Sequence, residues 1–205
     1  MKLRFALLAA LLALAAPALA AEKIDTGKAL ADRVLGKEDA PITVYEYASL
    51  TCPHCAAFNR VALPEIKKHL IDTGKAKMVF RDFPLDGYAF KAAAMARCAP
   101  DDKFYPLVDM IFAEQERWAR SSAPDDAVAK LGVLAGMEEE QIKSCMNDEG
   151  LKQAILEKMQ AAQKTYSISS TPTFIFMKGE ERMMEYPEWD AILKEAEKQQ
   201  DAHKH

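Results

Sequence analysis

Two cysteines, Cys52 and Cys55, stand where a predicted strand gives way to a predicted helix, and this placement restricts the folds open to the chain. The strand is the run from Ile42 to Tyr47, which follows Pro41 and is rich in β-branched and aromatic residues. Pro53 suits the first position of a helix, because the N–H that it lacks would have no partner there. The fold must therefore bring a pair of thiols to the N-terminus of a helix directly after a strand.

The residues that follow complete a strand–helix–strand pattern. Apolar residues at helical spacing run from Pro53 to about Ile71, and Pro64 among them predicts a kink because it cannot donate to the carbonyl of Arg60. The next run, KAKMVFRDF, is predicted to be a strand that ends before Pro84. This order is typical of two neighbouring parallel strands in an α/β sheet.

The middle of the chain has a different character. Between about Gly87 and Gly150 the sequence contains no convincing strand pattern, and Ser122 and Asp148 are expected to cap helices. The helices predicted there and just beyond are Tyr88 to Cys98, Asp102 to Trp118, Pro124 to Ala135, Glu138 to Met146 and Glu149 to Tyr166. Two strands, at 173–177 and 181–186, and a helix at 188–199 are predicted to follow. The sequence thus predicts an α/β fold interrupted by a helical block.

The first 20 residues have the layout of a secretory signal peptide. Lys2 and Arg4 precede an uninterrupted apolar run from Phe5 to Ala16, and Ala18-Leu19-Ala20 offers a small-residue cleavage site. That run is shorter than the roughly 20 residues that a membrane-spanning helix needs. We therefore expect export to the periplasm, an oxidising compartment in which disulfides can form. The formal net charge of −4 argues against nucleic acid as a partner.

The Cys52–Cys55 pair could bind a metal, form a structural bridge or exchange disulfides. A structural zinc site needs four ligands, but no second Cys-x-x-Cys pair is present, and His203, His205 and His69 lie in a polar tail and on a helix. A structural bridge between such close positions would constrain the unfolded chain little. The spacing therefore favours a redox pair, with no metal and no cofactor.

The start of a helix is a suitable place for a reactive thiol. At the N-cap, Cys52 would face unpaired backbone N–H groups and the positive end of the helix dipole, which favour thiolate over thiol. A stabilised thiolate is a good leaving group in disulfide exchange. Cys55, one turn on, would point into the fold and react less. His54, if protonated, would add a positive charge beside the thiolate.

Three features together resemble the bacterial periplasmic thiol–disulfide oxidoreductases of the DsbA family. They are Cys52-Pro53-His54-Cys55 after a strand, the helical block, and Thr171-Pro172 before a later strand. The resemblance covers the chain from about Leu35 to the last helix. It implies a thioredoxin fold with an inserted helical domain, divided into a first thioredoxin part (35–87), an insertion (88–147) and a second thioredoxin part (148–200).

The resemblance also implies roles for site residues. Cys52 would be the attacking, exposed cysteine and Cys55 its buried partner. Pro172 would be a cis-proline next to the pair, leaving the backbone of Thr171 free to pair with an extended substrate peptide. Glu46 would be a buried acid below the site that relays the proton of Cys55. Alternation along the strand permits an inward Glu46, although a glutamate exposed at a sheet edge is the alternative.

Cys98 and Cys145 lie in the helical block, where some members of this family have a second disulfide. Two cysteines in an oxidising compartment pair more often than not, so a structural Cys98–Cys145 bridge is expected, with an influence on the redox pair left open. Two separate buried thiols are the alternative.

These features favour a periplasmic dithiol oxidase that donates the Cys52–Cys55 disulfide to newly exported proteins and works as a monomer. By resemblance, a membrane quinone-linked partner would reoxidise it. A disulfide isomerase or reductase is the first alternative, although isomerases of this superfamily typically carry a dimerisation segment, and only about 20 mature residues precede Ile42 here. A copper(I)-binding thioredoxin-like protein is the second, because soft thiolates suit that ion.

Overall fold

The structure is a computed structural model that describes residues 24–202. The predicted signal peptide (1–20), His203 and His205 lie outside the described residues. Within residues 24–202, no helix combines the length and the apolar character needed to cross a bilayer.

Five strands of the described chain form one sheet in the order β1-β3-β2-β4-β5. Strand β2 pairs in parallel with β3 and antiparallel with β4, and the outer pairs β1–β3 and β4–β5 are antiparallel. The strands are β1 (Val34–Leu35), β2 (Ile42–Ala48), β3 (Ala76–Asp82), β4 (Thr173–Lys178) and β5 (Glu181–Met183). The central position of β2 means that the residues following it emerge from the middle of the sheet.

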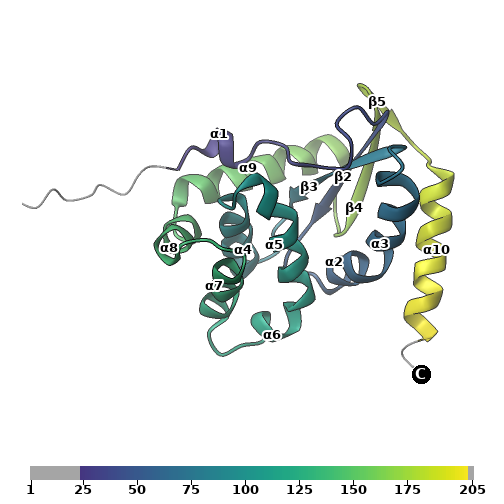
Figure 1. Cartoon of the computed structure of the whole chain (residues 1–205). Coiled ribbons are helices and arrows are strands. Elements are labelled where there is room, and N and C mark those ends of the chain that lie inside the picture. The colour runs from purple at the N-terminus through teal and green to yellow at the C-terminus, as the bar shows by residue number, and fades with distance from the viewer. Residues whose placement is uncertain (1–23, 203–205) are drawn as a thin grey trace, which may run out of the picture.

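The helical segment after β2 is irregular around Pro64. It comprises α2 (Pro53–Ala57), a π-helical segment η1 (Phe58–Ala62), α3 (Leu63–Ile66) and a second π-helical segment η2 (Lys67–Ile71). Proline removes one helical donor, and the segment departs from a regular α-helix on both sides of Pro64. The last helix, α10 (Pro187–Ala202), lies alongside α3 (Figure 1). Its Trp189 packs against Phe58, Phe174 and Phe176.

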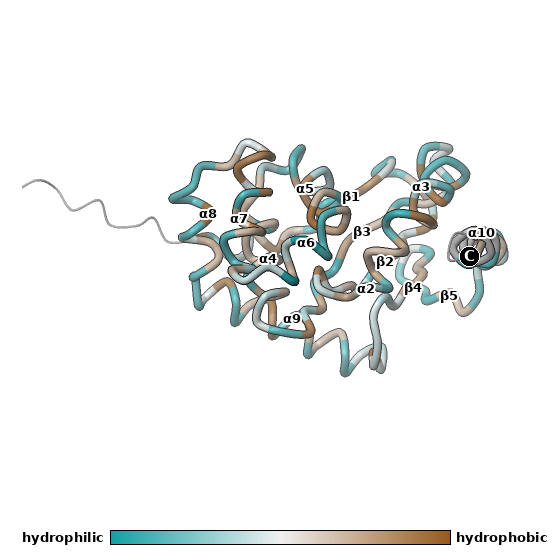
Figure 2. Tube along the Cα trace, turned by 90° about the horizontal axis from the view of Figure 1, so that it is seen from below, coloured by the Kyte–Doolittle hydropathy of each residue, from teal (hydrophilic) through white to brown (hydrophobic). Residues whose placement is uncertain are grey.

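Six helices lie between β3 and β4; the first five form the predicted helical block, seen at one end of the molecule in Figures 1 and 2, and the sixth runs from that end toward the sheet. They are α4 (Gly87–Arg97), α5 (Asp101–Ala113), α6 (Gln115–Ala119), α7 (Pro124–Leu134), α8 (Glu139–Met146) and α9 (Glu149–Tyr166). A disulfide joins Cys98, just after α4, to Cys145 in α8, with an S–S distance of 2.05 Å. The expected pairing of these two cysteines is therefore present.

Two local predictions in this block are wrong. The single helix predicted from Asp102 to Trp118 is broken at Glu114, whose φ of −97° and ψ of 9° depart from helical values. Past the break, the indole N–H of Trp118 donates to the carbonyl of Ile111, and α6 packs against α7. Ser122 does not cap α7. The N-cap is Ala123, whose side chain cannot accept a hydrogen bond, and Pro124 begins the helix.

The prediction that Asp148 caps α9 is confirmed, since its carboxylate accepts from the backbone N–H of Leu151 at 2.6 Å. The helix itself belongs to two cores. Leu151 and Ile155 lie in the hydrophobic cluster of the helical block, whereas Ala162 packs with Tyr47 and Ile175 of the sheet. A boundary at residues 147/148 would assign all of α9 to the thioredoxin part, and it remains a prediction.

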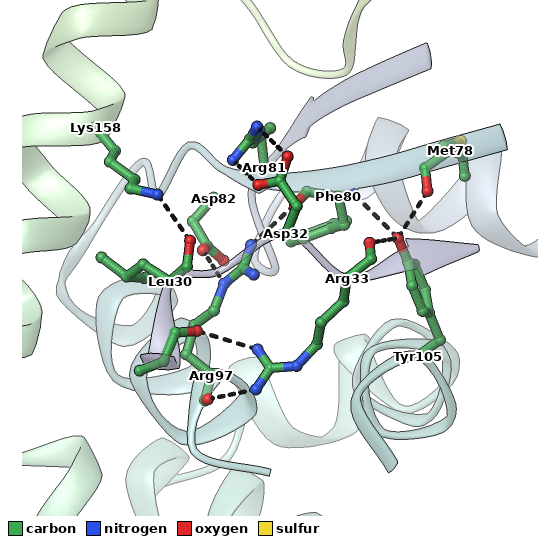
Figure 3. Close-up of polar contacts among 11 residues, drawn as sticks. Leu30, Asp32, Arg33, Met78, Phe80, Arg81, Asp82, Arg97, Tyr105 and Lys158 are labelled. Atoms are coloured by element: carbon green, nitrogen blue, oxygen red, sulfur yellow. Dashed lines mark hydrogen bonds and ion pairs between the residues drawn. The ribbon is translucent and has the colours of Figure 1, made fainter. Parts of the chain in front are cut away.

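The segment before β2 contains α1 (Thr26–Ala29) and β1, neither of which the sequence pattern predicted. Figure 3 shows how polar contacts anchor this segment. The Arg33 guanidinium donates to the carbonyls of Ala29, Arg97 and Ala99. The Tyr105 hydroxyl donates to the carbonyl of Arg33, and the Lys158 ammonium donates to the carbonyl of Leu30 (Figure 3). Both thioredoxin-fold strands and inserted helices therefore hold this segment in place.

Candidate redox site

Cys52 is the N-cap residue of α2, as the sequence predicted. Its backbone is extended, with φ −78° and ψ 119°, which turns Sγ toward the first turn of the helix. Sγ accepts the backbone N–H of Cys55 at 3.4 Å, while the carbonyl of Cys52 accepts the N–H of Ala56 at 3.1 Å. Cys52 and Cys55 are both free thiols, so the structure describes the reduced pair.

The expectation that Cys52 is exposed is wrong. Only 5% of Cys52 is accessible, and Cys55 is fully buried. The cover comes partly from a segment distant in sequence, since the Cys52 thiol lies 3.4 Å from the carbonyl oxygen of Thr171, to which it donates. The remainder comes from the hydrophobic cluster that both cysteines share with the helical block. Little of the reactive sulfur is therefore accessible to a second sulfur in this arrangement.

The two thiols differ in acidity. The pKa of Cys52 falls from 9.0 to about 5, chiefly because the Cys55 thiol donates a hydrogen bond to its sulfur. Burial opposes this fall. Hydrogen bonds from Thr171 and from the backbone amides of Cys55 and His54 lower the pKa further. The pKa of Cys55 is raised, because its thiol donates to Cys52 and because it is buried. Deprotonation therefore starts at Cys52.

His54 and Pro53 are exposed at the start of α2. Among the groups that lower the pKa of Cys52, His54 acts through its backbone amide. The predicted contribution of a protonated imidazole remains a prediction.

The Thr171–Pro172 peptide bond is cis, as the resemblance implied, and it lies beside the thiol pair. The following residue, Thr173, begins β4 opposite Tyr47, so β4 starts at the end of the sheet where Cys52 lies and runs antiparallel to β2 away from it. The hydroxyl oxygen of Thr171 is buried with no hydrogen-bond partner among the described residues. A hydroxyl can rotate its proton toward an acceptor, so it is available to a Cys52 thiolate.

Glu46 is buried, with 3% of its surface accessible, as the sequence analysis expected. It lies on β2 between Phe80 and Phe174 of the neighbouring strands, and its Oε1 has no partner among the described residues. Burial, together with repulsion from Asp109 on α5, raises the pKa of Glu46 to about 8. The carboxyl is therefore protonated at neutral pH, which suits the predicted role as a proton carrier.

Three residues that the sequence analysis did not identify contact or influence the site: Asp109 and Gln115 of the helical block, and Asp86, the N-cap residue of α4. Asp109 accepts a hydrogen bond from Asn59 of η1 at 2.8 Å, and burial raises its pKa. Gln115 donates to the backbone of the loop before α2, and Asp86 accepts the Thr51 hydroxyl at 2.6 Å. Each follows the Cys-x-x-Cys pair by at least 31 positions and lies in no motif, so only the fold brings it to the site.

The described residues provide no further group of metal ligands around Cys52 and Cys55. Nowhere in the described part of the chain do three or more His, Cys, Asp or Glu side chains come together in a group that could hold a metal ion. The two sulfurs would thus be the whole protein ligand set for a soft ion such as copper(I).

Comparisons with known sequences agree with this geometry. The protein-family model described as thioredoxin matches residues 18–195. A protein of Rickettsia conorii, named as a candidate protein-disulfide oxidoreductase, is 34% identical over 159 residues, which cover 77% of this chain and 57% of that protein. The chain thus spans little more than half the length of this relative. Disulfide bond formation protein D of Bacillus subtilis is 26% identical over 174 residues, covering 81% of this chain and 76% of that protein.

Solved structures share the fold. The crystal structure of Wolbachia pipientis α-DsbA1 superposes with a TM-score of 0.68 at 29% identity, covering 82% of this chain and 89% of that one. Oxidised BdbD of Bacillus subtilis gives a TM-score of 0.65 at 24% identity, covering 82% and 91%, and supports the fold alone. The predicted thioredoxin-like α/β fold with a helical insertion is therefore confirmed.

Proposed function

Because this chain belongs to the DsbA-like thiol–disulfide oxidoreductases of the thioredoxin superfamily, we propose that it exchanges disulfides with protein substrates and acts as a dithiol oxidase. The substrates would be reduced proteins that share its compartment. Residues 1–20 support export to the periplasm, and reoxidation would come from a membrane quinone-linked partner. We further propose that the protein works as a monomer.

One observation carries the proposed direction of exchange. Cys52 accepts hydrogen bonds at the start of α2 that lower its pKa to about 5, and Cys55 has no comparable help. A stabilised thiolate favours the reduced pair, so it makes the disulfide form a stronger oxidant. A reductase needs the opposite balance, with a disulfide that is hard to reduce.

The reaction consists of two exchanges. A substrate thiolate attacks Cys52 Sγ of the Cys52–Cys55 disulfide, the S–S bond breaks, and Cys55 leaves with the electron pair and takes up a proton. A second substrate thiolate then attacks the substrate sulfur of the mixed disulfide and releases Cys52 as a thiolate. The substrate loses two electrons, and the protein gains them as a thiol at Cys55 and a thiolate at Cys52.

Three groups support these steps by their positions. Burial and the raised pKa of Cys55 favour its protonation as it leaves. Glu46, protonated at neutral pH and buried below the site, would supply or accept that proton. The half-buried Thr171 and Pro172 would hold an extended substrate segment next to Cys52, with backbone pairing at Thr171.

The direction of exchange is tested by equilibrating the full mature chain with glutathione and measuring the reduction potential of the Cys52–Cys55 pair. We expect a value closer to about −120 mV, typical of a strong oxidant, than to about −270 mV, typical of thioredoxin. A value near thioredoxin's would contradict the oxidase assignment and favour a reductase.

The roles of the two cysteines are tested by single variants. Cys52→Ala should abolish disulfide transfer, because no sulfur remains to form the mixed disulfide. Cys55→Ala should instead accumulate mixed disulfides when Cys52 meets an oxidised substrate, because the resolving thiol is absent. Mass spectrometry under non-reducing conditions identifies the adduct. Adducts on Cys55 in the Cys52→Ala variant, together with no adducts on Cys52 in the Cys55→Ala variant, would reverse the assignment.

A further inference from the structure

Gln115 is the first residue of α6, and its side chain is buried against the loop that leads into the redox pair. Its Nε2 group donates two hydrogen bonds, to the carbonyl of Leu50 at 2.8 Å and to the carbonyl of Cys52 at 3.0 Å. Leu50 and Cys52 lie between the end of β2 and the start of α2. One side chain of the insertion therefore fixes the backbone of the loop that carries the reactive cysteine.

The carbonyl of Cys52 has two roles in this arrangement. It accepts the N–H of Ala56, which begins the hydrogen-bond pattern of α2, and it accepts the amide of Gln115 through its second lone pair. Its direction is coupled to the extended backbone of Cys52, the conformation that brings Sγ within 3.4 Å of the Cys55 N–H. A rotation of this peptide unit would move the sulfur relative to its donor.

We propose that Gln115 is a positioning residue for Cys52: by holding the carbonyls of Leu50 and Cys52, it keeps Sγ against the backbone N–H of Cys55 and thereby favours the thiolate over the thiol. The inference rests on the proposed function, because it takes Cys52 as the redox cysteine. It also gives the insertion a part in the chemistry, since α6 lies wholly outside the sheet and the α2 segment.

The surroundings separate this role from simple packing. The place of α6 has support besides Gln115, because the buried Trp118 donates its indole N–H to the carbonyl of Ile111 and α6 packs against α7. The loop also keeps a second contact through the Thr51 hydroxyl, which donates to Asp86, the N-cap residue of α4. Loss of the Gln115 donors should therefore leave both elements in place and release only the two carbonyls.

The test is Gln115→Met, which keeps the length and flexibility of the side chain and removes both donors. Gln141→Met is the control for the loss of an amide donor, because the exposed Gln141 likewise donates its amide to a backbone carbonyl, that of Cys98, but inside the insertion. Ultraviolet titration of the Cys52 thiolate in the reduced protein should show a midpoint about 0.5–1 pH unit higher in Gln115→Met and unchanged in Gln141→Met. The equilibrium with glutathione should move about 3–10-fold toward the protein disulfide in Gln115→Met.

A midpoint and an equilibrium equal to those of the wild type in Gln115→Met, even with lower stability, would overturn the proposal and leave Gln115 a packing residue. If Gln115→Met does not fold, Gln115→Asn gives the same comparison, because it keeps the amide but shortens its reach by one methylene. The thiolate titration uses no substrate. The expected shift of the titration midpoint can therefore be absent in a protein that still transfers disulfides, or present in a protein that transfers none.

Discussion

The acidity of Cys52 depends more on the direction of nearby N–H, S–H and O–H donors than on charged side chains. Its sulfur is surrounded by the Cys55 thiol and amide and by Thr171, and its pKa is lowered although burial opposes this. Sequence reasoning anticipated the N-cap position from Pro53, which starts the helix. It did not anticipate that Cys52 is buried, because the covering residue, Thr171, follows 119 positions later.

Glu46 is the residue whose removal should have the clearest pH signature. Below about pH 4.5 its carboxyl is protonated in both the folded and the unfolded chain, so burial adds no ionisation cost. Between pH 4.5 and about 8 the unfolded chain ionises while the folded chain keeps the proton, so stability falls as pH rises. The full loss is roughly 5 kcal/mol, at about 1.4 kcal/mol for each pH unit between the two values.

Glu46→Gln should therefore be more stable than the wild type, by a margin that grows from about pH 5 to pH 8. Denaturant unfolding across this pH range measures it, with Glu181→Gln on the exposed surface of β5 as the control. Glu46→Gln should also alter the pH dependence of disulfide exchange at Cys55 more than it alters the affinity for substrate. A stability difference that does not change with pH would mean that Glu46 is not the proton-holding group.

Among the elements, those with long hydrophobic periodicity could be predicted from sequence. Strands β2 and β3 and helices α4, α8 and α9 lie within a residue or two of their predicted bounds. Strand β5 ends three residues before the predicted Tyr186, and α1 and β1 are too short to produce a pattern. The break at Glu114 has no glycine or proline to signal it, and the packing of α6 against α7 that follows it is a tertiary contact without a sequence pattern.

The Cys98–Cys145 bridge joins α4 to α8, and its sequence separation of 47 residues makes it a strong constraint on the unfolded chain. The paired variant Cys98→Ala/Cys145→Ala should lower the free energy of unfolding by about 2–4 kcal/mol. Because the bridge joins α4 to α8, and the residues of the insertion that reach the site are Asp109 on α5 and Gln115 on α6, the thiolate titration of Cys52 should not change. A shifted titration in the paired variant would show that the bridge influences the redox pair.

For the molecule as a whole, the redox state of the Cys52–Cys55 pair should change the free energy of unfolding. The folded pKa of Cys52, about 5, is depressed below its ordinary 9.0, so the reduced fold gains stability that is fully present above about pH 9 and lost as pH falls through 5. The disulfide form has no such contribution. At pH 7 the gain is about 2 kcal/mol after a reduction for screening by solvent.

The reduced protein should thus be more stable than the Cys52–Cys55 disulfide form at pH 7, and the difference should shrink toward pH 5. Denaturant unfolding of both forms at several pH values measures it. His54→Ser keeps the backbone amide, so any further shrinkage in that variant isolates the imidazole. A disulfide form that is clearly the more stable at pH 7 would exclude an oxidase.

The first half of helix α9 belongs to the core of the insertion and its second half to the core of the sheet. This division affects how chimeras of such proteins can be built. A chimera that exchanged residues 88–147 between two relatives would place a foreign partner against Leu151 and Ile155. A chimera that exchanged α9 as well would place a foreign Ala162 against Tyr47 and Ile175. A working junction should lie within α9, after Ile155 and before Ala162, so that each half keeps the neighbours with which it evolved.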